Sequence, residues 1–106
     1  MSEEIQRNET ILAAVESAGG GYVWDAECFA VTLMDVAVSE ELVHALTGLV
    51  GVQQIALEAS TLKLNSLVCI ASIPGLTSLV LNHSSLNAEE VARLASIGPE
   101  IVCVQE

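Results

Sequence analysis

The sequence has few basic residues: Arg7, Lys63 and Arg93 stand against fourteen acidic side chains, and the formal net charge is -11 at pH 7. Three cations are too few to neutralise the phosphates along a nucleic-acid interface. The same deficit disfavours binding to an anionic membrane surface. We therefore expect no nucleic-acid partner and no membrane partner, and the charge favours a neutral or basic protein as the partner.

Targeting signals and cysteine motifs are also lacking. The first four residues, MSEE, are acidic, whereas a secretory signal needs a basic start followed by an apolar stretch. No window offers the roughly 18 apolar residues of a membrane span. Cys28, Cys69 and Cys103 are widely separated and form no CxxC pair or zinc-ligand spacing. We expect a cytoplasmic protein whose cysteines are reduced and packed as small buried hydrophobes.

Aromatic residues make up only 3% of the chain, although apolar residues make up 52%. The core must therefore be aliphatic, and this aliphatic content argues against a disordered acidic tail. A length of 106 residues suits one domain. Tyr22, Trp24 and Phe29 fall within eight residues. We expect them to cover the N-terminal end of the core; a binding hot spot is the alternative.

A repeat of 24 residues is present along the chain. Sliding the sequence against itself by 24 positions aligns three blocks that begin at Cys28, Val52 and Leu76. Seven columns are apolar in every block. In block order they are Cys28, Val52, Leu76; Val31, Ile55, Leu79; Leu33, Leu57, Leu81; Val38, Leu62, Leu86; Val43, Leu67, Val91; Leu46, Ile70, Leu94; and Leu49, Ile73, Ile97. Such spacing predicts a short strand followed by a short helix in each block, and stacking would bury the columns against one another.

Helix-start signals follow the expected strands. Ser39 precedes two glutamates and is a good N-cap, and Asn87 with Glu90 forms a capping-box pattern. The helix of the middle block lacks such a signal, and we expect it to begin near Asn65 or Ser66. At the N-terminus, residues 2–18 predict a helix that three glycines then end.

The repeat resembles the leucine-rich repeat family, whose unit reads L-x-x-L-x-L-x-x-N/C-x-L. Leu76-x-x-Leu79-x-Leu81-x-x-Ser84-x-Leu86 fits this unit, residues 52–62 fit it too, and residues 28–38 fit loosely. The ninth position holds Val36, Ser60 and Ser84 in place of the usual asparagine. The resemblance covers residues 28–99. It implies an α/β fold: a short right-handed solenoid with a parallel sheet of three or four strands on one face, short helices on the other and an N-terminal capping helix.

We expect one domain over residues 1–106. Residues 1–21 would form the capping helix and a glycine linker, residues 22–99 three 24-residue units, and residues 100–106 a terminal strand. In the leucine-rich repeat family the exposed face of the sheet contacts protein partners, so the resemblance implies a non-enzymatic protein–protein interaction module. Carried over by position, the partner-binding residues are Thr32, Met34, Asp35, Gln54, Glu58, Ser78, Val80, Asn82 and His83.

Catalytic motifs are missing from the sequence. The repeat places His44 and His83, the only histidines, on opposite faces. Asp35 and His83 would lie two strands apart, on the order of 10 Å, which is too far for an acid–base pair. No nucleophile elbow, phosphate loop or HExxH motif is present. We expect no enzymatic activity, no cofactor and no metal.

Two alternative functions remain open. The apolar segment 101–104 could leave an uncovered strand edge, which would suit a self-associating structural module and a homodimer through that edge. A small acidic α/β regulator of the anti-sigma-antagonist type is the other alternative. It would need a serine switch at a helix start, and Ser39 and Ser84 are the candidates by position.

Overall fold

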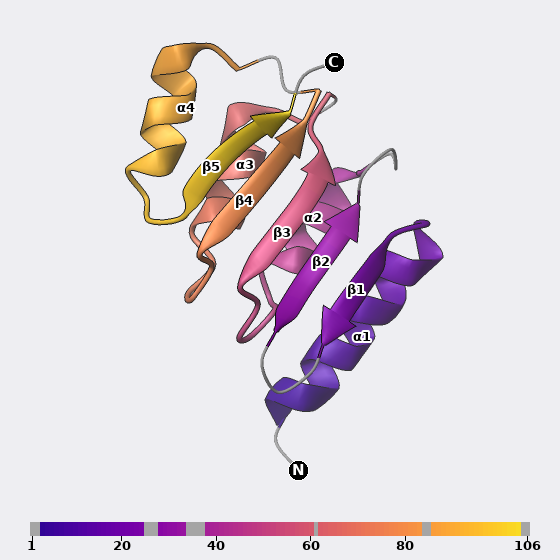
Figure 1. Cartoon of the computed structure of the whole chain (residues 1–106). Coiled ribbons are helices and arrows are strands. Elements are labelled where there is room, and N and C mark those ends of the chain that lie inside the picture. Colours follow the sequence, from indigo (N-terminus) through magenta and orange to yellow (C-terminus); the bar gives the residue numbers. More distant parts are fainter. Residues whose placement is uncertain (1–2, 25–27, 34–37, 61, 84–85, 105–106) are drawn as a thin grey trace.

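The computed structural model describes residues 3–24, 28–33, 38–60, 62–83 and 86–104 (Figure 1). Its helices are α1 (Glu3–Ser17), α2 (Glu40–Leu46), α3 (Leu64–Ala71) and α4 (Ala88–Ala95). Its strands are β1 (Gly21–Trp24), β2 (Phe29–Leu33), β3 (Gln54–Glu58), β4 (Ser78–Asn82) and β5 (Glu100–Val104). The protein is therefore of the α/β class.

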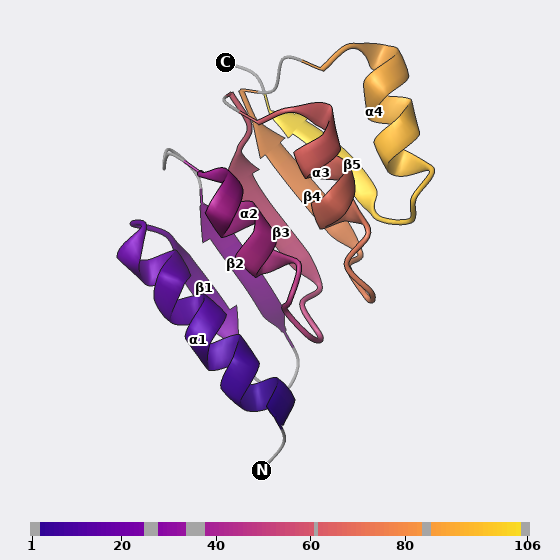
Figure 2. The ribbon, with the colours of Figure 1, turned by 180° about the vertical axis from the view of Figure 1, so that it is seen from behind.

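The sheet is mostly parallel, and the described helices all lie on one side of it. The strand order is β1-β2-β3-β4-β5, with β2 to β5 parallel and β1 antiparallel to β2. Figure 1 shows the uncovered face of the sheet, and Figure 2 shows the helices from behind. The sheet has one strand more than the expected three or four, because the segment after α1 adds β1 as an antiparallel edge.

The 24-residue repeat is also the register of the sheet. Val31 pairs with Ile55, which pairs with Leu79, and each step is 24 positions. The column of Leu33, Leu57 and Leu81 is aligned in the same way. The side chains of these two columns are buried. The step changes at β5, where Leu79 pairs with Ile101.

The core lies between the sheet and the helices. Leu46, Ile70 and Leu94, one from each of the last three helices, are fully buried. Four members of the apolar columns are not: Leu86 and Val91 are half-buried, Cys28 is exposed, and Ile97 is 38% exposed. Ile97 follows α4, the last described helix, so no further helix packs over it.

The two helix caps predicted from the sequence are present, and the helix without a predicted cap has none. The Oγ of Ser39 accepts a hydrogen bond from the N–H of Leu42, which confirms Ser39 as the N-cap of α2. The capping box of Asn87 and Glu90 is present with both of its hydrogen bonds. Helix α3 begins at Leu64, slightly before the expected start, and its N-cap makes no side-chain bond. Burial of its apolar side therefore stabilises this helix in place of a cap.

The glycine segment after α1 is more than a linker. Gly21 is the first residue of β1, which pairs with β2. A Cβ built on Gly20 would lie 2.4 Å from the Cδ2 of Leu33 and 2.7 Å from the carbonyl oxygen of Thr32. Only glycine lets the chain pass so close to β2. The sequence did not reveal β1, because these four residues lie outside the repeat and are exposed.

The aromatic and cysteine side chains differ in part from expectation. Phe29 is buried, and its ring stacks on Trp24 with 5.3 Å between the ring centroids. All three cysteines are exposed, so the expectation of buried thiols was wrong. Cys103 is exposed because it lies on the edge strand β5.

Within the described ranges, no helix is long and apolar enough to cross a membrane.

Candidate interaction surface

The face of the sheet that no described helix covers is the candidate site, and we call it the open face. Successive side chains of a strand point to opposite sides, so the residues between the buried ones point to this face. It comprises Val23, Ala30, Thr32, Gln54, Ala56, Glu58, Ser78, Val80, Asn82, Glu100, Val102 and Val104. The row that runs through Ala56, Val80 and Val102 is small and apolar.

Most of the residues expected at a binding surface lie on the open face. Thr32 and Gln54 are exposed there, and Ser78 and Val80 are half-buried. Three more come together at the carboxyl ends of β3 and β4: Glu58, Asn82 and His83. Met34 and Asp35 lie outside the described residues, so the spacing between Asp35 and His83 is not defined.

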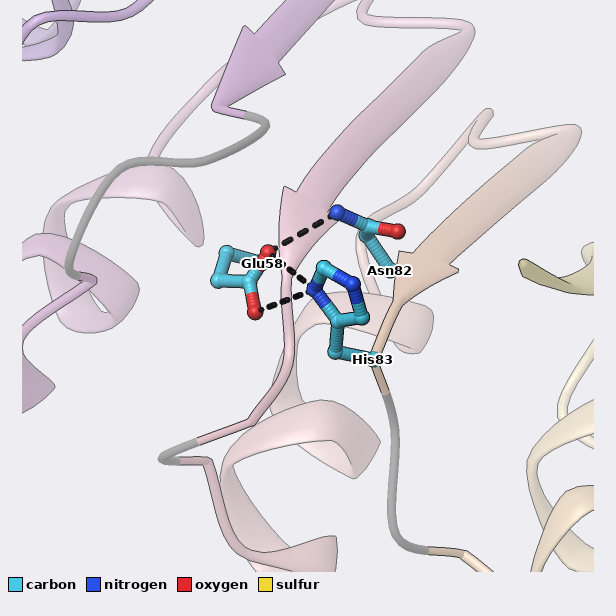
Figure 3. Close-up of polar contacts among 3 residues, drawn as sticks. All are labelled: Glu58, Asn82 and His83. Atoms are coloured by element: carbon cyan, nitrogen blue, oxygen red, sulfur yellow. Dashed lines mark hydrogen bonds and ion pairs between the residues drawn. The ribbon is translucent and has the colours of Figure 1, made fainter. Parts of the chain in front are cut away.

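Glu58, Asn82 and His83 form one hydrogen-bonded cluster (Figure 3). The Nδ2 of Asn82 donates to the Oε1 of Glu58 at 2.9 Å. The Nδ1 of His83 lies 3.1 Å from Oε1 and 3.0 Å from Oε2 of the same carboxylate. The side chain of Glu58 is only 13% exposed, whereas that of His83 is 43% exposed. The carboxylate is therefore held in one orientation, and the imidazole beside it is the more exposed of the two groups.

The cluster lowers the pKa of Glu58 below its ordinary value. Desolvation by burial is the largest single influence, and it acts to raise the pKa. The hydrogen bond from Ser60, the hydrogen bond and charge of His83, and the hydrogen bond from Asn82 together outweigh it. Glu58 is therefore a carboxylate at neutral pH, held in a defined orientation on an otherwise mostly neutral part of the face.

The backbone of His83 helps to hold the cluster. Its φ of 57° is in the left-handed region, which is uncommon for a residue with a Cβ. Its N–H donates to the carbonyl of Val104 at 3.1 Å, while the N–H of Ala59 donates to the carbonyl of Asn82 at 2.8 Å. These bonds join the carboxyl ends of three adjacent strands. The turn at His83 directs its side chain back toward β3 (Figure 3).

Sequence reasoning named all three residues of the cluster but did not pair Glu58 with His83. It aligned His83 with Ala59 and Asp35, the residues 24 and 48 positions away, and tested only that column for an acid–base pair. The register of β3 and β4 could have revealed this pair. It places Glu58 opposite Asn82 and therefore beside His83, the next residue in the chain. A left-handed backbone at His83 could not be read from its residue type.

A second concavity lies on the helix side, between α2 and α3. This groove has a volume of about 640 Å³, and its lining includes His44, Cys69 and Val68. Glu40, also in the lining, accepts a hydrogen bond from Ser66 at 3.0 Å. In the described part of the chain, no group of three or more histidine, cysteine or acidic side chains is placed to hold a metal ion. His44 and His83 lie on opposite sides of the sheet, as expected.

Comparison with known proteins gives no match: no family model, curated protein or solved structure matches this chain.

Proposed function

We propose that the chain is a short leucine-rich-repeat-like solenoid that acts as a non-enzymatic protein–protein interaction module. Its binding site is the open face, and its partner is a neutral or basic protein. The regular step of 24 residues between paired strands supports the repeat, because equivalent positions of successive units stack in one column. The uncovered sheet beside a helix-covered side supports the choice of face (Figures 1 and 2).

The observation that carries the proposal is the fixed carboxylate of Glu58. Asn82 and His83 already hold this side chain in one orientation on the open face. Glu58 therefore loses little conformational entropy when a partner binds to it. A lysine or arginine of the partner would make a charge-assisted hydrogen bond to it. The lowered pKa keeps Glu58 charged at neutral pH, which suits an electrostatic anchor better than a proton donor.

The neutral residues around Glu58 support a protein partner over a small anion. Thr32, Ala56 and Val80 form a row of small, uncharged residues across three strands near the carboxylate. Such a surface lets the backbone or side chains of another protein approach the sheet closely. With a net charge of -11, long-range attraction would also favour a basic surface over an acidic one.

A matched pair of double variants tests this function. Gln54→Ala with Glu58→Gln changes the open face, and Asn65→Ala with Glu89→Gln changes the helix side; each pair truncates one amide side chain to alanine and replaces one carboxylate by a neutral amide. Each protein is immobilised, and the proteins retained from native lysate are quantified. We expect the open-face variant to lose, by about tenfold or more, proteins that the wild type and the helix-side variant retain. Equal recovery by the two variants would reject the open face as the binding site.

A further inference from the structure

Strand β5 is an edge strand, and its hydrogen bonds to β4 define which way its backbone groups point. It is last in the order of the described sheet. The N–H of Glu100 donates to the carbonyl of Thr77 at 2.9 Å, and the carbonyl of Val104 accepts from the N–H of His83 at 3.1 Å. Both ends of β5 therefore direct their backbone groups toward β4.

The outward backbone groups of β5 belong to Ile101 and Cys103. The N–H and C=O of one residue point to the same side of a strand, and the side alternates along the strand. Because residues 100 and 104 point inward, Val102 also points inward, and Ile101 and Cys103 point away from the sheet. Among the residues that the structure describes, no backbone hydrogen bond outside the sheet ladders reaches these four groups. The edge is therefore open to one more strand.

The apolar side chains near this edge are covered less than their counterparts in earlier units. Leu79, one strand inward, is fully buried, whereas its partner Ile101 is only half-buried. Val91 of α4 is half-buried, whereas Leu67 at the same position of the preceding unit is fully buried. Ile97 is 38% exposed. An added strand with apolar side chains on the helix side would cover this end of the core.

The position of helix α4 limits which strands can pair with the free edge of β5. Both views place α4 outward of β5 (Figures 1 and 2). A second copy that paired its own β5 about a two-fold axis would bring the two strands to about 4.8 Å. Because α4 lies outward of β5, the two α4 helices would meet across the seam, where packed helices need an axis separation of about 8–10 Å. A single extended segment has no such helix and fits beside β5.

We propose that the β5 edge binds an extended protein segment as a sixth, antiparallel strand, with apolar and basic residues alternating along it. Apolar residues opposite Ile101 and Cys103 would lie on the helix side, near α4. Basic residues between them would lie on the open-face side, next to Glu100, and would complement the net charge of -11. This inference does not depend on the proposed function, because it uses the edge of the sheet and not the Glu58 cluster.

The test uses the acetylated and amidated peptide Lys-Val-Lys-Val-Lys-Val-Lys as a probe. Its binding is followed by fluorescence anisotropy, and amide hydrogen exchange of the protein is measured by NMR. We expect saturable binding. In the unbound protein the amides of Ile101 and Cys103 should exchange quickly and that of Val102 slowly. Bound peptide should protect the first two amides.

Two N-methylated forms of the peptide provide the matched control. In an antiparallel pair the residues directly opposite Ile101 and Cys103 exchange hydrogen bonds with them, and these are the valines. N-methylation of the valines should abolish binding, whereas N-methylation of the inner lysines should preserve it. Binding of the N-methyl-valine peptide as tightly as the unmodified one, or no saturable binding of the unmodified peptide, would overturn the proposal.

Variants of the protein, in place of modified peptides, test the same edge. Cys103→Pro removes an outward N–H and leaves the ladder to β4 intact, which proline tolerates on an edge. It should weaken peptide binding by about tenfold or more, whereas Cys103→Ser and the double variant Gln54→Ala, Glu58→Gln should bind as the wild type does. Unchanged binding by Cys103→Pro would overturn the proposal. A concentration-dependent dimer that Cys103→Pro abolishes would assign the edge to a second copy instead.

Discussion

At the scale of single residues, Glu58 shows how the repeat produces a polar site. The 24-residue register places it beside Asn82, and the turn at His83 brings an imidazole onto the same carboxylate. The column containing Glu58 and Asn82 could be predicted from the sequence. The contact with His83 could not, because it depends on a left-handed backbone angle that most histidines do not adopt.

The first prediction concerns the pH dependence of stability. The pKa of Glu58 is lowered in the folded protein, so the unfolded chain binds its proton more readily. Glu58 therefore stabilises the fold above its ordinary pKa of about 4.5, and this contribution is lost as the pH falls through the lower folded value. The difference in unfolding free energy between the wild type and Glu58→Gln should shrink as the pH falls from 7 to 3.

Urea unfolding at several pH values measures that difference. Glu9→Gln is the control, because Glu9 is exposed on α1 and makes no hydrogen bond recorded among the described residues. Its difference from the wild type should stay smaller and depend less on pH. A difference for Glu58→Gln that is constant, or that grows toward low pH, would contradict the stabilising role of the cluster.

The second prediction concerns the backbone of His83. A left-handed conformation costs a residue with a Cβ about 1–2 kcal/mol, and glycine avoids this cost. His83→Ala and His83→Gly both lose the contact with Glu58, so their comparison isolates the backbone. We expect His83→Gly to be more stable than His83→Ala by about 1 kcal/mol in urea unfolding. Equal stability, or a more stable alanine variant, would show that the turn does not hold this angle.

At the scale of elements, α1 is attached to the repeat by a buried polar residue as well as by apolar packing. Asn8 is 4% exposed. Its Nδ2 donates to the carbonyl of Val50 at 2.8 Å, and its Oδ1 accepts from the N–H of the same residue at 2.9 Å. This pair of bonds fixes α1 against the segment that follows α2. A polar residue in the middle of a helix gave no sequence signal for such a role.

The third prediction follows from this attachment. Asn8→Ala leaves both backbone groups of Val50 without their partner, and we expect the unfolding free energy to fall by about 1–3 kcal/mol. Thr10→Ala is the matched control, because Thr10 is exposed and its hydroxyl bonds only within α1; its effect should stay within about 0.5 kcal/mol. Thermal or urea unfolding measures both, and equal effects of the two substitutions would contradict the account.

The elements that the sequence predicted best are those inside the repeat. Val31, Ile55 and Leu79 repeat at a fixed step because each strand must bury the same side against a helix. The strand β1 could not be predicted in this way, since it is short, exposed and antiparallel. Exposure of Ile97 could not be predicted either, because it depends on which element follows in space and not on the residue itself.

At the scale of the whole molecule, charge and packing act in opposite directions. The aliphatic columns are buried between sheet and helices, while the net charge of -11 is distributed over a small surface. Among the described residues, the contact between Glu58 and His83 is the only one within 4.0 Å between a carboxylate oxygen and a basic nitrogen. The carboxylates therefore repel one another over most of the surface, and this repulsion opposes the compact state.

The fourth prediction concerns salt. The Debye length falls from about 30 Å at 0.01 M ionic strength to about 8 Å at 0.15 M, so salt screens repulsion between distant carboxylates. The unfolding free energy and the melting temperature should rise as sodium chloride increases over this range. A series of thermal unfolding curves at fixed pH provides the measurement. Stability that falls with added salt would mean that attractive pairs dominate the surface.

The central claim, that the open face binds a protein partner, is tested most directly by site-specific photo-cross-linking in cells that naturally make the protein. A photoreactive residue is placed at Thr32, which is exposed on the open face, or at Asn65, which is exposed on the helix side. The account predicts a discrete cross-linked species with another protein from position 32 and none from position 65. Cross-links only from position 65, or from neither position, would contradict it.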